Sequence, residues 1–297
     1  MLPDDILRRI TGYYCWQYGV LTGHVCRSWR RNILSITNGN NTNKGSIHDW
    51  DSLVETFASN GHVRLLQWLF EIAHDYHKNS ANKSPAWDLV VAHDGSLIAS
   101  VAAIGGHVDI IRKCWEYGVF NFTTAMLNAA SAGHIEIVRL CKEQYGEDDV
   151  NRAMIRAACG GHIHIVRLCR EKYGAKGIDQ TMVHAAKNGH IDIVRLCKET
   201  YGATDIDEAM VCAACGGHMD IVQLCKEKYG ATDVNPAMIE AARNGHMDIV
   251  RLCEEEYGAT AVYSAMVCAQ LHHHMAIVRL FKRKYGVTDL GPKQYET

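Results

Sequence analysis

The sequence has no long apolar run and no excess of either charge, and its first residues do not have the pattern of a secretory signal. None of its segments approaches the ~18 consecutive apolar residues that span a bilayer, although 47% of its 297 residues are hydrophobic. The formal net charge is −2, which argues against a nucleic-acid clamp and a polybasic membrane anchor. The first residues, MLPDDILRRI, lack the apolar core of a secretory signal. We therefore expect a globular protein that is not secreted and binds neither nucleic acid nor membrane.

Common catalytic motifs are also missing. The chain contains no Gly-x-x-x-x-Gly-Lys-Ser/Thr phosphate loop, no His-Glu-x-x-His zinc helix and no Gly-x-Ser-x-Gly nucleophile turn. A repetitive helical pattern leaves little irregular backbone from which to build a catalytic pocket. We predict no catalytic residues, no enzymatic activity and no cofactor.

One pattern occurs six times, 28 residues apart. It reads Gly-His-x-x-Ile-Val-x-Leu-Cys-x-x-x-Tyr-Gly, with substitutions in the last copy, and its histidines are His134, His162, His190, His218, His246 and His274. Gly61-His62 and Gly106-His107 mark two earlier copies, which gives eight units. A fixed period of this size indicates a solenoid, in which each unit buries its apolar face against its neighbours.

Each unit predicts two helices. The first carries Ala-Met-x-x-Ala-Ala and ends at glycine, which favours a left-handed C-cap; the second has apolar residues at helical spacing and ends at another glycine. Eleven residues before each histidine stands a residue type that caps helix N-termini. These predicted N-caps are Asp51, Ser96, Thr123, Asn151, Asp179, Asp207 and Asn235. In the last unit Tyr263, Gln270, His273 and Phe281 replace the usual residues, as expected of a capping repeat.

The signature Ala-Ala-x-x-Gly-His-x-x-Ile-Val resembles that of ankyrin repeats. The resemblance implies an all-α solenoid of about eight helix pairs over residues 50–290, with an insertion at about 74–93 and a tail at 291–297. The usual Thr-Pro-Leu-His opening is absent, and the period is 28 rather than about 33, so we expect a short turn in place of the projecting hairpin. Compact arrays of this kind are similar to the expanded ankyrin families of large DNA viruses that infect amoebae.

The N-terminal residues 1–36 are not explained by the repeat. Leu-Pro-acid-acid-x-Leu followed by Val-Cys-x-x-Trp resembles an F-box, a helical module that docks onto the adaptor subunit of cullin-based ubiquitin ligases. The positions that match the motif are Leu2, Pro3, Ile6, Leu7, Ile10, Val25 and Trp29. Residues 37–49 are polar and contain glycine, as in a flexible linker. The alternative is a helical cap that shields the first repeat.

Twelve cysteines and 17 histidines invite a metal site, but the repeat spacing argues against one. Cys114, Cys141, Cys169, Cys197, Cys225 and Cys253 occupy one position in successive units. Stacked helices lie ~8–10 Å apart, whereas a disulfide needs Cα atoms within ~7 Å and zinc ligands must converge. We predict buried, reduced thiols in a reducing compartment, and histidines that hydrogen-bond backbone between helices. Cys212-Ala-Ala-Cys215 lacks the second cysteine pair that zinc would need, so we predict no metal.

A partner surface is expected where packing does not fix the residue. Two positions on the first helix vary between units, and in ankyrin repeats this helix lines the concave face, so the resemblance implies binding there; neutral drift of exposed residues is the alternative. The predicted residues are Asn128, Ser131, Arg156, Cys159, His184, Lys187, Cys212, Cys215, Glu240 and Arg243.

The arginine and the tyrosine that recur in successive units each have two possible interpretations. The repeated arginines could bind phosphate, but we favour solvated pairs with acids three residues earlier, such as Asp192 with Arg195 and Asp248 with Arg251. The repeated tyrosines favour packing between units over base stacking. Together the patterns predict a monomeric, non-enzymatic adaptor in the cytoplasm or nucleus of the host cell. Its array would hold an unknown target protein, and its N-terminus would reach a ubiquitin ligase; the alternative is a plain scaffold that masks its partner.

Overall fold

The computed structural model describes Ala58, Gly61 and residues 95–116 and 121–286. All of these belong to the unit spanning Phe57–Thr297. Within the described ranges the regular elements are helices and no strand occurs. The predicted N-terminal module (1–36), linker (37–49), insertion (74–93) and tail (291–297) lie outside the described residues.

The described helices form seven consecutive pairs, each a first helix followed by a second. The first two pairs are α6 (Gly95–Ile104) with α7 (Val108–Glu116), and α8 (Thr123–Ala132) with α9 (Ile135–Glu143). The last pair is α18 (Val262–Leu271) with α19 (Met275–Tyr285). Four pairs lie between them, so the predicted all-α helical array is confirmed for this part of the chain.

In those four pairs the second helix ends in a π-helical turn, whose backbone bonds span five residues. The elements are α10 (Val150–Cys159), α11 (Ile163–Arg167) and η2 (Leu168–Lys172); α12 (Ile178–Lys187), α13 (Ile191–Arg195) and η3 (Leu196–Thr200); α14 (Ile206–Gly216), α15 (Met219–Gln223) and η4 (Leu224–Lys228); α16 (Val234–Arg243), α17 (Met247–Arg251) and η5 (Leu252–Glu256). In each of these turns the tyrosine N–H reaches back five residues; Tyr173 N donates to Leu168 O at 3.3 Å.

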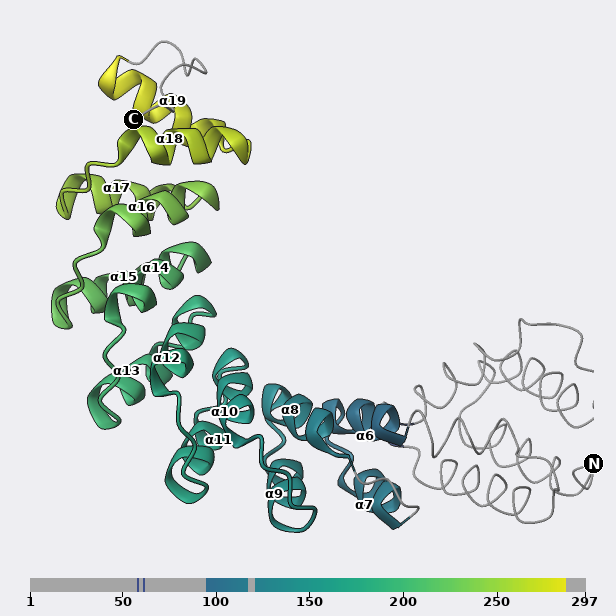
Figure 1. Cartoon of the computed structure of the whole chain (residues 1–297). Helices are drawn as coiled ribbons and strands as arrows, with labels where there is room; N and C mark the ends of the chain where they lie inside the picture. Colours follow the sequence, from purple (N-terminus) through teal and green to yellow (C-terminus); the bar gives the residue numbers. More distant parts are fainter. Residues whose placement is uncertain (1–57, 59–60, 62–94, 117–120, 287–297) are drawn as a thin grey trace, which may run out of the picture. The chain divides into compact units, whose positions relative to one another are not determined.

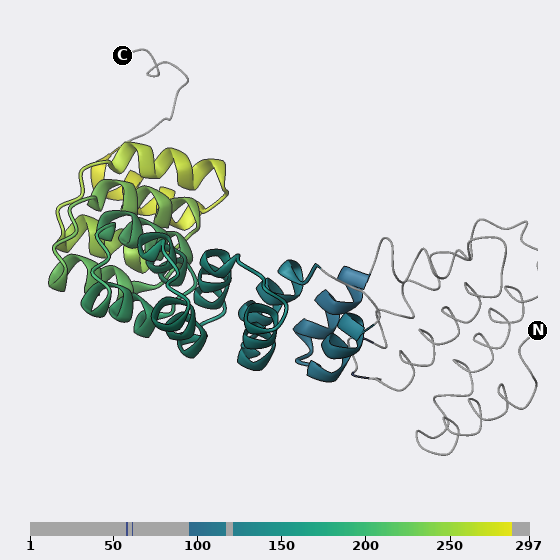
Figure 2. The ribbon, with the colours of Figure 1, turned by 60° about the horizontal axis from the view of Figure 1, so that its bottom comes forward.

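The pairs stack in sequence order into a curved row (Figure 1). Each first helix packs on the first helix of the next pair, and these helices line the inner side of the curve while the second helices lie on its outer side (Figure 1). Figure 2 shows the same row from another direction, with the pairs following one another. The first helices can approach closely because their facing side chains are small: Ala153, Ala157 and Ala158 on α10 are fully buried.

The core repeats with the sequence. In successive units the same methionine, alanine pair, Ile-Val pair and cysteine are buried, for example Met182, Val194 and Cys197, each 0% exposed. The six repeated cysteines are buried, and all ten cysteines that the structure describes are free thiols. They behave as small hydrophobic side chains, as the spacing of the repeat predicts.

A histidine joins each of five successive units, from α8–α9 to α16–α17, to the unit before it. His134 Nε2 lies 2.9 Å from Ile104 O, and the same contact recurs for His162 with Ser131 O (3.0 Å) and His218 with Lys187 O (3.1 Å). A carbonyl oxygen only accepts, so Nε2 carries the proton and donates. The acceptors lie in the last turn of the preceding first helix, where carbonyls lack helical partners. The predicted backbone bond of the histidines is confirmed, and its acceptor belongs to the neighbouring unit.

Glycine leaves room for that histidine ring. Gly189 ends the first helix of its unit with φ +82°, as predicted for a left-handed C-cap. A Cβ at this position would lie 2.5 Å from Cε1 of His218, which belongs to the next unit. Gly202, at the end of the second helix, has a similar φ of +75°, but an added Cβ would meet nothing within 4 Å. Gly189 is therefore required by both its backbone conformation and the neighbouring ring, whereas Gly202 is required by its backbone conformation alone.

From Ser96 onward the predicted N-caps are wrong, because each residue lies within its helix; Asp51 lies outside the described residues. Asp207 lies second in α14, which begins at Ile206, and no side-chain cap bond forms there. Its Oδ1 instead accepts from Thr232 N (2.5 Å) and Asp233 N (2.9 Å) in the loop of the next unit. The same role falls to Asn151, Asp179 and Asn235. Asp or Asn is needed at this position because its side-chain oxygen accepts hydrogen bonds from the N–H groups of the loop that leads into the next unit.

Alanine at the two glycines should separate backbone strain from steric contact. Both Gly189→Ala and Gly202→Ala impose a left-handed backbone on a residue with a Cβ, at about 1–2 kcal/mol. Only Gly189→Ala also pushes against His218, which should add about 1–3 kcal/mol. We expect urea unfolding to give a clearly lower midpoint for Gly189→Ala than for Gly202→Ala. Equal midpoints would contradict the inter-unit contact.

Candidate functional site

The variable positions predicted for partner binding lie together on the first helices. They come from α8, α10, α12, α14 and α16, and each is exposed or half-buried. Since the first helices line the inner side of the curve (Figure 1), these positions form one continuous surface. It is called the inner face below and consists of Asn128, Ser131, Arg156, Cys159, His184, Lys187, Cys212, Cys215, Glu240 and Arg243. The placement agrees with the prediction; the binding role stays a prediction.

An apolar row runs beside these positions and was missed by sequence reasoning. The residue after the repeated methionine is always aliphatic, and from α10 onward its side chain is only half-buried. The row consists of Leu127, which is 6% exposed, and the half-buried Ile155, Val183, Val211, Ile239 and Val267. The signal was available in the repeated Met-Leu, Met-Ile and Met-Val pairs. The inner face thus combines partly exposed apolar side chains with a changing set of polar ones.

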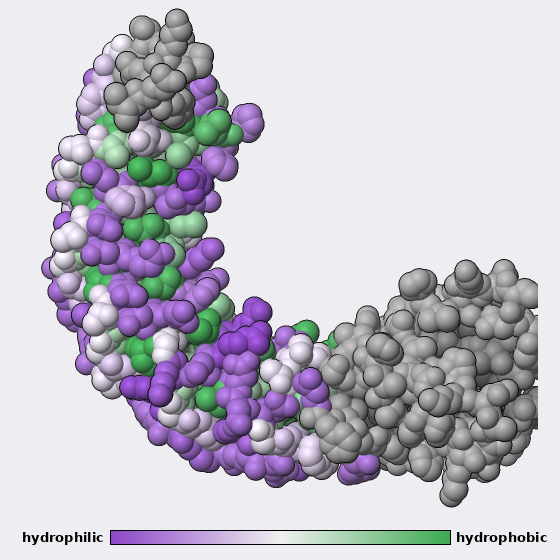
Figure 3. Space-filling model, in the orientation of Figure 1, coloured by the Kyte–Doolittle hydropathy of each residue, from purple (hydrophilic) through white to green (hydrophobic). Residues whose placement is uncertain are grey.

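Basic side chains gather on the inner face at α10 and α12. Arg156, His184 and Lys187 are exposed, and within the described part of the chain no ion pair joins them to a carboxylate. Burial raises the pKa of the Cys159 thiol, and the charges of Arg156 and Lys187 oppose that rise, which places both cations near this sulfur. Figure 3 shows hydrophilic side chains over this part of the stack.

Other arginines of the first helices are neutralised. Arg152 pairs with Asp149 at 2.8 Å, and Arg243 pairs with Glu240 at 2.6 Å. Helix α8, with the sequence TTAMLNAASA, carries no charge. The basic character is therefore confined to one stretch of the inner face.

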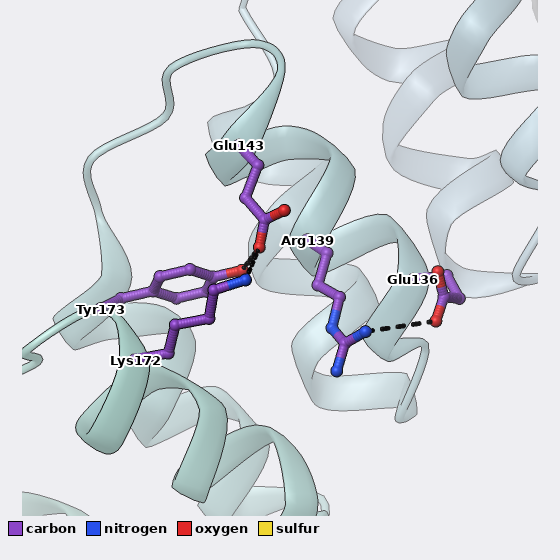
Figure 4. Close-up of polar contacts among 5 residues, drawn as sticks. All are labelled: Glu136, Arg139, Glu143, Lys172 and Tyr173. Atoms are coloured by element: carbon purple, nitrogen blue, oxygen red, sulfur yellow. Dashed lines mark hydrogen bonds and ion pairs between the residues drawn. The ribbon is translucent and has the colours of Figure 1, made fainter.

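The outer side is held by a repeated polar link between units. Tyr173 Oη donates to Glu143 of the preceding unit at 2.6 Å, and Lys172 Nζ donates to the same carboxylate at 2.6 Å (Figure 4). Tyr201 donates to Glu171 at 2.7 Å in the same way. Hydrogen bonds from Lys172 and Tyr173 hold the pKa of Glu143 below its usual value. The tyrosine ladder therefore joins units, as the packing interpretation predicts.

The expected arginine pairs are mostly absent. Arg139 lies 3.9 Å from Glu136, but in the described part of the chain no ion pair joins Asp192 to Arg195 or Asp248 to Arg251. The charge of Arg195 acts instead on Glu199, one turn onward, whose pKa is lowered first by hydrogen bonds from the next unit and also by this arginine. The i,i+3 pairing was wrong because the arginine's electrostatic partners lie one turn onward and in the neighbouring unit.

The cysteine pair on α14 has no metal-site geometry around it. Cys212 and Cys215 are half-buried on one face of the helix; Cys212 Sγ lies 3.6 Å from Glu208 Oε1, and Asn244 Nδ2 donates to Cys215 Sγ at 3.6 Å. No group of three or more His, Cys, Asp or Glu residues that could hold a metal ion occurs in the described residues. Among the same residues, no helix has the length and apolar character needed to cross a membrane.

Comparison with known proteins does not assign the chain to a family. The chain matches no family model and no curated protein. The seven F-box-like positions from Leu2 to Trp29 lie outside the described residues. Docking to a ligase adaptor through these positions therefore stays a prediction.

The tyrosine–glutamate links should make the array sensitive to alkali. Burial and the bond to Glu171 raise the pKa of Tyr201 to about 12. The neutral phenol is therefore favoured by folding. Its contribution to stability is complete below the pKa of tyrosine in the unfolded chain, near 10, and is lost as the pH rises through the pKa of the folded chain. We expect the melting temperature to fall between pH 10 and pH 12.

Tyr201→Phe should lower the melting temperature at pH 7 by about 2 °C, as expected for one exposed hydrogen bond in a chain of this size. It should also reduce the alkaline fall. The matched control is Tyr263→Phe on α18, since Tyr263 is exposed and makes no side-chain hydrogen bond with any described residue. Identical pH profiles for all three proteins would rule out the link.

The cysteines should differ in reactivity according to burial. Burial raises the pKa of Cys169 and Cys197 to about 12, and that of the half-buried Cys212 to about 11. Because the thiolate is the nucleophile, iodoacetamide at pH 8 should modify Cys212 about tenfold faster or more. Peptide mass spectrometry of the native protein gives the rates, and urea should equalise them. Equal native rates would contradict the buried position.

Proposed function

We propose that the chain is a non-enzymatic adaptor that binds a target protein on the inner face of its helical array. The observation that carries the proposal is the contrast between positions in each unit. The buried methionine, alanines and Ile-Val pair recur almost unchanged, whereas the exposed positions of the first helices change from unit to unit. A surface of this kind offers many side-chain combinations on one scaffold, which suits recognition of another protein.

The inner face also has the composition of a binding surface. Half-buried aliphatic side chains run beside polar and charged residues, and interfaces combine apolar anchors with polar contacts that set orientation. The inter-unit bonds of histidine, aspartate and tyrosine hold neighbouring units in place. A preorganised surface loses less entropy on binding than a loose one does.

The sequence signature of the repeat resembles that of ankyrin repeats, and this resemblance supports binding by the inner face. The F-box-like residues Leu2, Pro3 and Trp29 extend the proposal to a ubiquitin ligase: the array captures the target and the N-terminus engages the ligase adaptor. Such a protein contributes effective concentration, since tethering makes the second encounter intramolecular. Its working compartment would be the cytoplasm or nucleus of a host cell, and it would act as a monomer.

Crosslinking in cells followed by mass spectrometry tests both parts. We expect crosslinks from the target to map to the first helices, and the ligase adaptor to co-purify with the full chain. Leu2→Ala with Trp29→Ala should remove the ligase adaptor and leave the target bound. If target crosslinks map only to the second helices, the inner-face proposal is wrong.

Deletion of residues 1–45 distinguishes a tethered module from a cap. Loss of a module should leave the melting temperature of the array unchanged, whereas loss of a cap should lower it because an apolar end would face water. A lower melting temperature together with no bound ligase adaptor would favour the plain scaffold that masks its partner.

A further inference from the structure

We propose that the inner face of α10 and α12 takes an acidic polypeptide segment whose carboxylates alternate with apolar side chains. This inference rests on the proposed function and names the chemistry of the target. It comes from two features of the same surface. One is a cluster of basic side chains that form no ion pair with any described carboxylate, called the basic step and made of Arg156, His184 and Lys187; the other is the apolar row that passes beside it.

The basic step is not balanced by the elements around it. Helix α8 has no charged residue, and Arg152 on α10 already pairs with Asp149. The carboxylate of Asp179 on α12 accepts from Thr204 N and Asp205 N in the next loop.

On α14 the exposed acid is Glu208, in the first turn of the helix. Lys187 corresponds in the repeat to Cys215, seven residues after Glu208. The Glu208 side chain nevertheless reaches along the helix: its Oε1 lies 3.6 Å from Cys212 Sγ, and the charges of Glu208 and Lys187 both act on that thiol. Among the described residues, no ion pair joins Glu208 to Lys187. The basic step thus has one carboxylate nearby but forms no ion pair with it, so its side chains can still bind the carboxylates of a partner.

The apolar row adjoins the cations directly. Val183 lies four residues before Lys187 on α12, so the two are neighbours on the helix surface. Ile155 holds the equivalent position on α10, and both aliphatic side chains are half-buried. A partner that places a carboxylate on the basic step thus brings its neighbouring side chains over aliphatic surface. Apolar side chains on that partner would bury both surfaces from water.

These features favour a polypeptide over a nucleic acid. Single strands bind where aromatic side chains stack on bases, and the first helices α8, α10, α12, α14 and α16 contain no Phe, Tyr or Trp. Two charged side chains, Arg156 and Lys187, on a chain with net charge −2 form a short patch, whereas nucleic-acid affinity grows with the number of phosphates neutralised. A peptide needs only two or three carboxylates to match it.

The spacing of the helices gives the spacing of the carboxylates. Neighbouring packed helices lie about 8–10 Å apart, and an extended chain advances about 3.3 Å per residue. A segment that crosses α10 and α12 therefore moves from one helix to the next in about three residues. We expect Asp or Glu about three positions apart, with Leu, Ile, Val or Met between them.

Selection from a random peptide library tests the chemistry without assuming a sequence. A phage library of 12-residue peptides is panned against the full chain, and the enriched peptides are synthesised with a fluorophore. We expect Asp or Glu at about three-residue spacing with aliphatic residues between them. Affinity should fall as salt rises, because screening weakens exposed charge pairs.

Matched variants locate the site. Arg156→Glu with Lys187→Glu reverses two charges on the inner face, and Arg195→Glu with Arg251→Glu makes the same change in net charge on the outer helices. We expect the inner variant to bind the selected peptides at least tenfold more weakly and the outer variant to bind within twofold of the original chain. Circular dichroism melts confirm that both variants fold. Arg156→Gln with Lys187→Gln replaces the inner variant if that variant does not fold.

Several results would overturn the inference. They are no enriched peptide, enrichment of neutral or basic peptides, and equal binding by the inner and outer variants. A 20-nucleotide single strand of thymidine that binds as tightly as the peptides, and loses binding in the inner variant, would replace the peptide with a nucleic acid. If cellular crosslinks map to the first helices but the bound target segment is not acidic, this inference fails and the proposed function stands.

Discussion

The hydrogen bond from a histidine to the last turn of the preceding unit is the interaction on which the array depends. It pairs a helix-end carbonyl that would otherwise lack a partner with the Nε2–H of the ring, at 2.9 Å for His134 and 3.1 Å for His246. The ring must also lie over the glycine of that preceding unit, where a Cβ would come within 2.6 Å of it for Gly133. Histidine, glycine and left-handed backbone therefore meet one requirement, which explains why they recur together every 28 residues.

Two further bonds repeat with the same period and act at other points of the unit. An Asp or Asn near the start of α10, α12, α14 and α16 binds the next loop, as Asp179 does with Thr204 N at 2.5 Å. A tyrosine on the second helix binds the preceding glutamate, as Tyr257 does with Glu227 at 2.9 Å. Three separated attachments fix one unit on the next in both position and rotation. Side chains that take no part in these three bonds, chiefly on the inner face, can differ between units. Such differences can serve recognition without weakening the contacts between units.

The sequence predicted what is local or strictly periodic and missed what crosses between units. Helix pairs, buried cysteines and left-handed glycines follow from spacing within one unit, and all are found. The N-caps were wrong because Asp207 satisfies a capping rule locally, while its acceptor oxygen serves a loop 25 residues further on. The pairing of Asp192 with Arg195 failed for a similar reason, since the cluster around Glu199 includes Lys228 and Tyr229 of the next unit. The apolar row was visible as an aliphatic residue after each methionine, but burial decides whether it is core or surface.

The last described unit shows which of two constraints, the left-handed backbone or the contact with a histidine ring, requires glycine at the end of the first helix. His273 occupies the glycine position and still has φ +64°, the one positive value outside glycine in the described part of the chain. The stack therefore imposes a left-handed backbone even on a residue with a Cβ, at about 1–2 kcal/mol. Its side chain is exposed, so it is accommodated there. In the earlier units the ring of the following histidine excludes a Cβ, so steric contact with the neighbour, more than backbone preference, keeps that position glycine.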